Sequence, residues 1–230
     1  MNKEVPTRDR INQQIYETIY RQGQELLKYP DEILVSYLYT TVKKDPSIKK
    51  ILDVGCGSGR HVVLFAREGF AASGIETSPS ALVYAQKFLE TEGLDADLKP
   101  GSCSQIDFAD DAFDLLLCWG VINNVVENGE LEKTMQELKR VLRKDGRLLI
   151  SFMAPEDKKF KGAVLVEDNV YQINYKDSSY HTRFWNREES VAFLTKYNFE
   201  TEKIGFVLRN VNFDEEIPVS YYTVAARNIK

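Results

Sequence analysis

The stretch ILDVGCGSGRH, residues 51–61, is the most informative part of the chain, because an apolar run leads into an acid and then into alternating glycines. Gly55, Gly57 and Gly59 lack Cβ atoms, so the backbone can turn tightly there and lie against a bound ligand. The apolar segment VVLFA that follows predicts a helix. A glycine turn between a strand and a helix N-terminus is where α/β folds hold nucleotides, so we expect a ligand that contains a nucleoside.

Strands and helices alternate on both sides of this turn. We expect strands over residues 51–54, 71–76, 96–100, 113–119 and 147–153, with helices over residues 60–68, 79–92 and 131–142 between them. Alternation of this kind indicates parallel βαβ units with right-handed crossovers. The predicted fold is therefore α/β, a Rossmann-like, doubly wound and mostly parallel sheet in a three-layer α/β/α arrangement.

The N-terminal part of the chain precedes the first predicted strand. Ile11, Ile15 and Ile19 recur at helical spacing and predict an amphipathic helix over residues 8–28. A second helix is expected after Pro30, whose acidic neighbours suit a helix N-terminus. Residues 1–48 are therefore predicted to form a helical extension of one domain that comprises residues 1–230.

Beyond residue 155 the alternation stops. Residues 164–175 predict a β-hairpin with its turn at residues 167–169, inside an insert over residues 155–186. A capping box at Asn186 and Glu189 then opens a helix. Two last strands near residues 200–208 and 219–227 are expected to form an antiparallel hairpin at the edge of the sheet.

Composition limits the classes of function. The chain has 230 residues, of which 43% are hydrophobic, so it can bury one sizeable core. No stretch approaches the roughly 18 to 20 apolar residues of a membrane span, and the N-terminus lacks an apolar signal core. We therefore expect a cytoplasmic protein with no membrane partner. The formal net charge of −5 argues against a nucleic-acid partner, because nucleic-acid surfaces are normally basic.

Cysteine and histidine are too scattered to predict a metal site. Cys56, Cys103 and Cys118 have no close spacing, and His61 and His181 are the only histidines. We expect free thiols and no metal. All three cysteines fall at or just past the ends of predicted parallel strands, which is the edge of the sheet where ligands bind.

Two classes of nucleotide site compete for the glycine turn. A nicotinamide site normally shows the spacing G-x-G-x-x-G close to the chain start. Here the spacing is Gly55-x-Gly57-x-Gly59, Arg60 occupies the place of the third glycine, and a long extension comes first. A bulky Arg60 would hinder the close approach of the helix to a pyrophosphate, so a nicotinamide-dependent oxidoreductase is the less favoured alternative.

The pattern resembles motif I of the class I S-adenosylmethionine-dependent methyltransferases, and the resemblance extends over residues 51–152. Glu76 ends the second predicted strand, where that family places an acid. GSCSQIDFADDAFDLLL, residues 101–117, is similar to the family's loop after the third strand and its fourth strand. ELKRVLRKDGRLLISF, residues 137–152, is similar to the last helix, turn and fifth strand, with Lys144-Asp145-Gly146 in place of the usual Pro-Gly-Gly.

The resemblance implies S-adenosylmethionine as cofactor, with S-adenosylhomocysteine as its product. It implies that Glu76 binds the two ribose hydroxyls, that Asp53 lies near the charged methionine end, and that Trp119 and Gly120 lie beside the methionine. The predicted cofactor-binding residues are Asp53, Gly55, Cys56, Gly57, Gly59, Glu76, Thr77, Ser102, Cys103, Cys118, Trp119 and Gly120.

Ser102 is a departure from the family pattern. The family usually has an acid there, which accepts a hydrogen bond from the adenine amino group. A hydroxyl can accept that bond but lacks the assistance of a charge, so we expect this contact to hold adenine less tightly. The backbone N–H of Cys103 remains to meet a ring nitrogen.

The acceptor is expected to be a small molecule. The chain lacks the Asn/Asp-Pro-Pro-Tyr run of enzymes that methylate planar amines, and it shows no set of metal-binding carboxylates. The predicted reaction is an in-line displacement by an O, N or C nucleophile, with residues 1–48 as a cap and residues 155–186 covering the acceptor site. His181 is the candidate general base, because histidine titrates near neutral pH. A protein that binds S-adenosylmethionine without catalysis is the alternative, and the sequence leaves the acceptor and the oligomeric state open.

Overall fold

The computed structural model describes residues 6–175, 178–210 and 218–230. Its centre is a seven-stranded sheet in the order β3-β2-β1-β4-β5-β10-β9. Five neighbouring strands are parallel, whereas β10 is antiparallel to both β5 and β9. The strands are β1 (Lys50–Val54), β2 (Ala71–Glu76), β3 (Asp97–Pro100), β4 (Phe113–Cys118), β5 (Leu142–Met153), β9 (Phe199–Asn210) and β10 (Pro218–Asn228). The predicted parallel sheet with an antiparallel C-terminal edge hairpin is confirmed.

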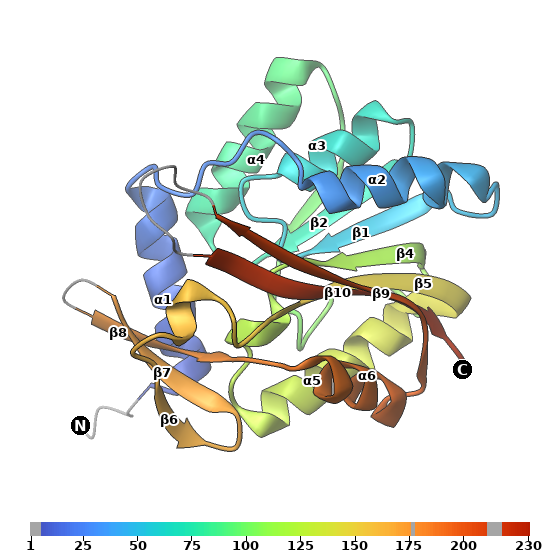
Figure 1. Ribbon diagram of the computed structural model, residues 1–230. Helices are drawn as coiled ribbons and strands as arrows, with labels where there is room; N and C mark the ends of the chain where they lie inside the picture. Colours follow the sequence, from blue (N-terminus) through green and yellow to red (C-terminus); the bar gives the residue numbers. More distant parts are fainter. Residues whose placement is uncertain (1–5, 176–177, 211–217) are drawn as a thin grey trace.

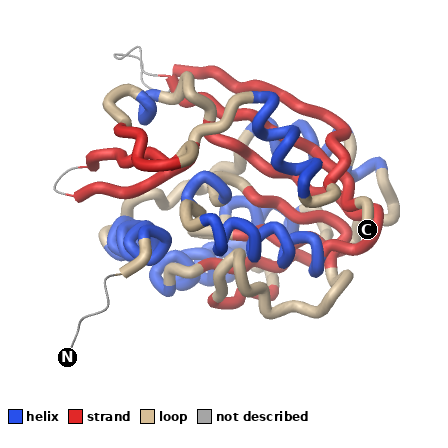
Figure 2. Tube along the Cα trace, turned by 90° about the horizontal axis from the view of Figure 1, so that it is seen from below, coloured by secondary structure: helices blue, strands red, loops and turns tan. Residues whose placement is uncertain are grey.

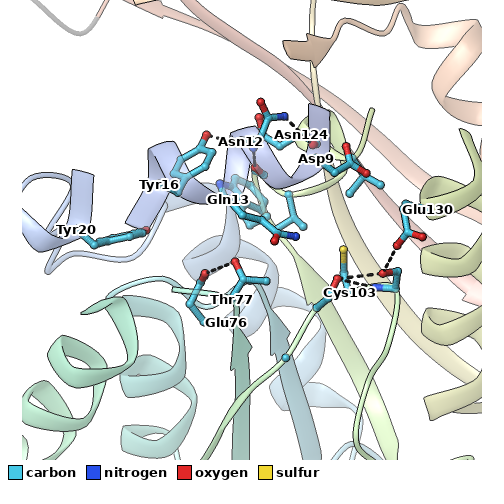
Figure 3. A pocket seen from close by; sticks show the side chains of 18 residues that line it. Asp9, Asn12, Gln13, Tyr16, Tyr20, Glu76, Thr77, Cys103, Asn124 and Glu130 are labelled. Atoms are coloured by element: carbon cyan, nitrogen blue, oxygen red, sulfur yellow. Dashed lines mark hydrogen bonds between the residues drawn. The ribbon is translucent and has the colours of Figure 1, made fainter. Parts of the chain in front are cut away.

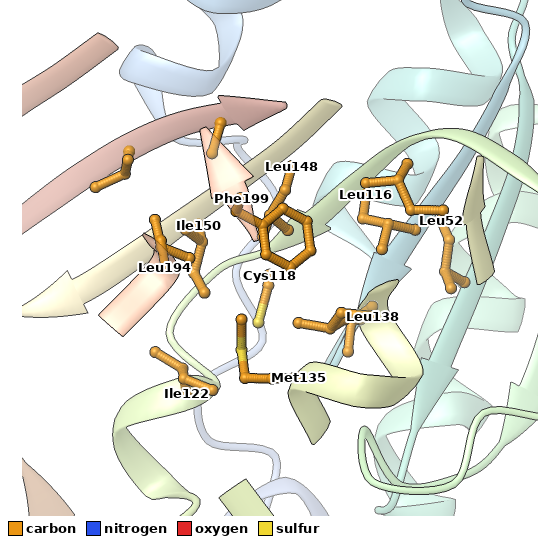
Figure 4. Close-up of a cluster of buried hydrophobic side chains, with 14 of the residues drawn as sticks. Leu52, Leu116, Cys118, Ile122, Met135, Leu138, Leu148, Ile150, Leu194 and Phe199 are labelled. Carbon is orange, nitrogen blue, oxygen red and sulfur yellow. The ribbon is translucent and has the colours of Figure 1, made fainter. Parts of the chain in front are cut away.

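Helices cover both faces of the sheet (Figure 1). On one face lie α2 (Glu32–Thr40), α3 (Arg60–Arg67) and α4 (Pro79–Glu92), and on the other α5 (Asn128–Val141) and α6 (Arg187–Lys196). Each interface is filled by its own apolar cluster, because the strands present apolar side chains to both faces. Figure 4 shows the cluster under α5 and α6, where Met135, Leu138 and Leu194 pack on the strands. The predicted three-layer arrangement is confirmed.

Helix α1 (Arg8–Arg21) ends well before the predicted end at residue 28. Gln22 caps the helix, and Gly23 adopts a left-handed φ of +72°, which breaks the helical hydrogen bonding. The apolar periodicity beyond that point, at Leu26 and Leu27, therefore does not extend the helix. The remaining residues before α2 cross to the other side of the glycine turn as a loop.

The insert forms a second, three-stranded antiparallel sheet of β6 (Val164–Glu167), β7 (Val170–Tyr175) and β8 (Ser178–Arg183). The predicted hairpin turn is present, with Asn169 in the left-handed region. The strand β8 was not predicted, because its sequence SSYHTR carries no apolar alternation. Figures 1 and 2 place this sheet and α1 at the same end of the molecule, where β8 contacts α1.

Strand β5 starts at Leu142, ahead of the predicted start at residue 147. The predicted turn at Lys144-Asp145-Gly146 lies inside this strand, with Asp145 at a φ of +60°. The pairing with β4 passes from Leu142 directly to Arg147, so the turn residues form a bulge.

Three short 3₁₀ helices complete the described part of the chain: η1 (Val42–Lys44), η2 (Ile122–Asn124) and η3 (Lys158–Phe160). Among the residues that the structure describes, no helix has the length and apolar character needed to cross a bilayer.

Candidate functional site

The glycine turn connects β1 to α3 at the carboxyl edge of the sheet. The backbone N–H groups of Gly55 and Cys56 both donate to the carbonyl oxygen of Ile75, at 2.8 and 2.9 Å, which ties the turn to the neighbouring strand β2. Gly59 is the N-cap residue of α3. The turn therefore lies at the N-terminus of a helix and beside the end of β2, as the sequence predicted.

Glu76 is buried at the end of β2, with 9% of its surface exposed. Its Oε2 accepts from the backbone N–H of Gly57 at 3.0 Å, and its Oε1 accepts from the N–H of Ser78 at 2.9 Å. These bonds fix the carboxylate between the glycine turn and the start of α4. A carboxylate held in this way presents its remaining lone pairs to the vicinal hydroxyls of a ribose.

Helix α1 closes the site from the other side. The hydroxyl of Tyr20 lies 2.5 Å from the position that a Cβ on Gly57 would take, so a side chain at that position would displace it. Glu17 anchors the helix, because its carboxylate accepts from the hydroxyls of Ser78 and Ser80 at 2.6 and 2.7 Å. The N-terminal extension is thus bonded to the first turn of α4.

A pocket lies between α1 and the carboxyl edge of the sheet (Figure 3). Seven of the predicted cofactor-binding residues line it: Gly55, Glu76, Thr77, Ser102, Cys103, Trp119 and Gly120. They come from four separate segments of the chain, which the parallel strands bring to one edge. The structure thus brings together seven residues that the family resemblance assigned to the cofactor site.

The other five predicted residues do not line this pocket. Cys118 is fully buried in the cluster under α5, and Cys56 is buried in the cluster under α3. Gly57 faces Tyr20, whereas Gly59 faces Ala85 of α4. Asp53 lies beneath the turn with 1% of its surface exposed. These five residues therefore pack against the core or against neighbouring helices and support the turn without lining the pocket.

Asp53 and His61 form a buried pair below the glycine turn. The Nδ1 atom of His61 lies 3.8 Å from Oδ2 of Asp53, and that oxygen accepts no hydrogen bond from any described residue. Burial raises the pKa of Asp53 to about 8, which the carboxylate of Glu76 reinforces and Arg60 opposes. Burial holds the pKa of His61 well below its usual range, and Arg60 adds to this shift. Asp53 therefore lies below the pocket floor as a largely protonated acid in the ligand-free fold, out of direct reach of a ligand in the pocket.

An Asp53→Asn variant is expected to lose less stability at alkaline pH than the parent protein does. In the ligand-free fold Asp53 keeps its proton up to about pH 8, whereas in the unfolded chain it ionises near pH 4. Between these values the native state binds more protons, so its stability falls as the pH rises. Urea unfolding at pH 5 and pH 9 measures this. We expect the free energy of unfolding of the variant, relative to the parent, to rise by at least about 2 kcal/mol over that range. Parallel pH curves would contradict the shifted pKa.

Sequence reasoning missed most of the wall that α1 supplies. Asn12 is buried, and its amide donates to the carbonyl oxygens of Asn124 and His181 at 3.0 and 2.8 Å while accepting from the N–H of His181 at 3.0 Å. The side chain thereby ties α1 to β8 and to η2. A polar residue next to the apolar stripe of Ile11 and Ile15 was the available signal.

His181 itself does not line the pocket. It lies on β8, and its backbone N–H and carbonyl groups form hydrogen bonds with the side chain of Asn12 on α1. Partial burial lowers the pKa of its ring, and the charges of Arg8 and Glu127 act on it from the neighbouring elements. The structure therefore does not bring its imidazole together with the predicted cofactor residues.

The pocket carries negative charge. Asp9, Glu76 and Glu130 contribute carboxylates to its wall, and Tyr16, Tyr20 and Trp119 contribute aromatic rings. Asp9 accepts from the backbone N–H groups of Val126 and Glu127, yet burial raises its pKa to about 6. Carboxylates and aromatic faces both favour a cation. The wall therefore fits S-adenosylmethionine, whose sulfur is positively charged, and Glu76 fits its ribose.

Comparison with known proteins identifies the central part of the chain. Residues 51–146 match a family model described as a methyltransferase domain. This part of the chain is a methyltransferase domain. The predicted resemblance to class I S-adenosylmethionine-dependent methyltransferases is thereby confirmed for these residues, and S-adenosylmethionine is the cofactor of such a domain.

Curated relatives match this chain over different shares of their own length. A ubiquinone biosynthesis O-methyltransferase of Rickettsia prowazekii is 23% identical over 200 residues, which cover 84% of this chain and 78% of that protein. Two other bacterial methyltransferases are matched over only 52% and 42% of their own length.

Solved structures share the fold over almost the whole chain. The Burkholderia thailandensis 1,6-didemethyltoxoflavin-N1-methyltransferase, solved with S-adenosylhomocysteine, has a TM-score of 0.71 at 16% identity and covers 100% of this chain and 94% of its own. The [4+2]-cyclase SpnF has a TM-score of 0.70 at 15% identity and covers 99% of this chain and 98% of its own. The fold around the methyltransferase domain thus also occurs in a protein named for a different reaction.

Proposed function

We propose that the protein transfers a methyl group from S-adenosylmethionine to an O, N or C nucleophile of a small molecule, by in-line displacement. The observation that carries this proposal is the pocket that joins Glu76 and the glycine turn to the side chains of α1 (Figure 3). One wall fits the methyl donor, and the opposite wall offers polar groups to a second molecule. The net charge of −5 supports an acceptor other than a nucleic acid.

When bound, S-adenosylmethionine supplies a methyl group on a positively charged sulfur, so the reaction needs alignment more than further activation. The protein's contribution is then to fix the surroundings. The backbone N–H of Gly120 donates to the hydroxyl of Ser151 at 2.8 Å, which holds the end of β4 in place. Trp119 packs edge-on against Tyr221 and His61, so its indole is fixed beside the pocket.

The acceptor is proposed to bind beside Gln13 and Tyr16 of α1. Both side chains line the pocket, and Figure 3 shows them across from Glu76 and Thr77. The hydroxyl of Tyr16 accepts from the side-chain amide of Asn124 at 3.2 Å, which leaves its proton free for a ligand. Helix α1 is therefore the part of the predicted cap, residues 1–48, that borders the pocket, whereas α2 packs on a face of the sheet. The insert of residues 155–186 supports that cap through Asn12 and β8, so it covers the acceptor site indirectly.

A general-base role for His181 stays a prediction, and a His181→Gln variant tests it. Removing a general base costs about 10²- to 10⁴-fold in turnover. Because the imidazole lies outside the pocket wall, we expect kcat to fall by less than about fivefold. The measurement is methyl transfer at saturating cofactor. A loss above a hundredfold with unchanged affinity for S-adenosylhomocysteine would instead establish His181 as the base.

Three measurements test the proposed function. Titration calorimetry with S-adenosylhomocysteine tests the donor site, and a thermal-shift comparison with NAD separates the oxidoreductase alternative, because a ligand of the native state raises apparent stability. Incubation with labelled S-adenosylmethionine and a metabolite extract then tests transfer. Binding followed by a labelled small molecule supports the proposal. Stabilisation by NAD alone would refute it.

The alternative without methyl transfer has a specific observation in its favour, which is the likeness to a cyclase of the same fold. Binding of S-adenosylhomocysteine without any labelled product, across extracts of different composition, would favour that alternative.

A further inference from the structure

Three polar residues form a hydrogen-bonded chain at the end of the pocket farthest from Tyr20. The hydroxyl of Ser104 lies 2.6 Å from Oε2 of Glu130 and 3.0 Å from the hydroxyl of Ser102. The backbone N–H of Ser104 also donates to the Ser102 hydroxyl, at 3.3 Å. All three residues line the pocket, and Figure 3 shows Glu130 of α5 directed at the loop that carries Cys103.

The protons in this chain can point in only one direction. A carboxylate only accepts hydrogen bonds, so Ser104 must give its single hydroxyl proton to Glu130. The bond between the two serines then needs a proton from Ser102, because Ser104 has none left to give. Ser102 lines the pocket, and with its proton committed its hydroxyl can accept a hydrogen bond from a ligand but has no proton to offer one.

Glu130 is held in its ionised form by its neighbours. Lys133 donates to its other carboxylate oxygen at 2.8 Å, and together with the Ser104 hydroxyl it holds the pKa of Glu130 below its usual range. Thr134, on the same helix, donates to the sulfur of Cys103 at 3.4 Å, so the loop is fixed to α5 at a second point.

The position of these three hydrogen-bonded residues relative to Glu76 determines which part of a bound nucleoside they contact. The backbone N–H of Gly101 donates to the carbonyl oxygen of Glu76 at 3.1 Å, so the loop over residues 101–104 starts beside the ribose-binding carboxylate. Residues 101–104 line the same pocket as Glu76, so they can contact the base of a nucleoside whose ribose lies at that carboxylate.

We propose that Glu130, acting through Ser104, fixes Ser102 as a hydrogen-bond acceptor and so makes this end of the pocket select a purine with an exocyclic amino group against one with an oxo group. The inference rests on the proposed function, since it assumes that the pocket binds the S-adenosyl group. Glu130 is in this sense a positioning residue. In the family pattern a carboxylate stands at the position of Ser102. Here the carboxylate of Glu130 acts on Ser102 from a distance, by orienting the hydroxyl groups of Ser104 and Ser102.

The test compares two ligands that differ only at the base edge, S-adenosyl-L-homocysteine and S-inosyl-L-homocysteine. Titration calorimetry gives the ratio of their dissociation constants for the parent protein and for three variants. Glu130→Gln gives the chain a group that donates to Ser104, which allows both serine protons to reverse. Ser104→Ala removes the link. Glu132→Gln removes the same charge from an exposed position on α5 and is the matched control.

We expect the parent protein and Glu132→Gln to prefer S-adenosyl-L-homocysteine by about thirtyfold or more. In Glu130→Gln and Ser104→Ala that preference should fall by about tenfold, with the thermal midpoint close to that of the parent. A merely structural role for Glu130 would weaken both ligands equally and leave the ratio unchanged, which would overturn the inference. A parent protein that binds S-adenosyl-L-homocysteine without preference would also overturn it. A parent protein that binds neither ligand would refute the proposed function itself.

Discussion

A Glu76→Gln variant is expected to bind S-adenosylhomocysteine about 100-fold more weakly than the parent protein. We propose that the carboxylate of Glu76 accepts from both ribose hydroxyls of the ligand, and charge-assisted hydrogen bonds are the strong ones. An amide offers one acceptor and turns a donor toward the second hydroxyl. The loss of about 3 kcal/mol that two such bonds imply corresponds to this factor.

The structure also provides the control for this experiment. Glu76 accepts from the backbone N–H groups of Gly57 and Ser78, so its replacement also affects the turn. Glutamine keeps the volume of the side chain, and the thermal midpoint of the ligand-free variant reports any damage to the fold. Glu90→Gln, at an exposed position on α4, should leave the affinity unchanged. An affinity for Glu76→Gln within threefold of the parent would mean that the ribose lies elsewhere.

Gly59→Ala is expected to destabilise the fold by at least about 3 kcal/mol. Gly59 has a φ of +89°, and a Cβ there would stand 2.8 Å from Cβ and 3.0 Å from Cα of the buried residue Ala85. The second of these distances is to the backbone of α4, which cannot move aside as a flexible side chain can. The substitution therefore has two costs. Alanine must adopt a left-handed backbone conformation, and α3 must move away from α4.

Gly69→Ala isolates the two contributions. Gly69 has nearly the same φ, +86°, but nothing lies within 4 Å of its Cβ position. This variant should lose only the about 1 kcal/mol of a left-handed non-glycine residue. Urea unfolding of both variants measures the difference. Equal losses would show that Ala85 yields, and that the close approach of the two helices is not the reason for glycine at position 59.

The structure changes the reason for the glycines at three predicted site positions. In sequence, Gly59 belongs to a set of three alternating glycines, and the natural inference is that all three accommodate a ligand. In the structure Gly55 lines the pocket but its Cβ position is taken up by Val121, Gly57 makes room for the hydroxyl of Tyr20, and Gly59 makes room for α4. A local pattern predicts that a side chain is excluded, but it cannot say which neighbour excludes it.

Polar residues to which the family pattern assigns no role were the hardest to predict. Ser104 and Glu130 carry no signal of their own, since serine in a loop and glutamate in the first turn of a helix are both common. Only the packing of α5 beside the loop over residues 101–104 makes them partners. Asn12 gains its role in the same way, through hydrogen bonds to His181, which is 169 positions away in the chain.

The sequence by itself determined the sheet, the position of the glycine turn and the residues at the carboxyl edge of the sheet that line one side of the pocket. Those features depend on periodicity and on short motifs at the ends of parallel strands, and such information is local. The tertiary structure alone decided which residues form the opposite wall, why Gly59 is a glycine, and that Glu130 faces Ser102 through Ser104. These interactions join segments far apart in the chain, and they depend on how the helices pack on the sheet.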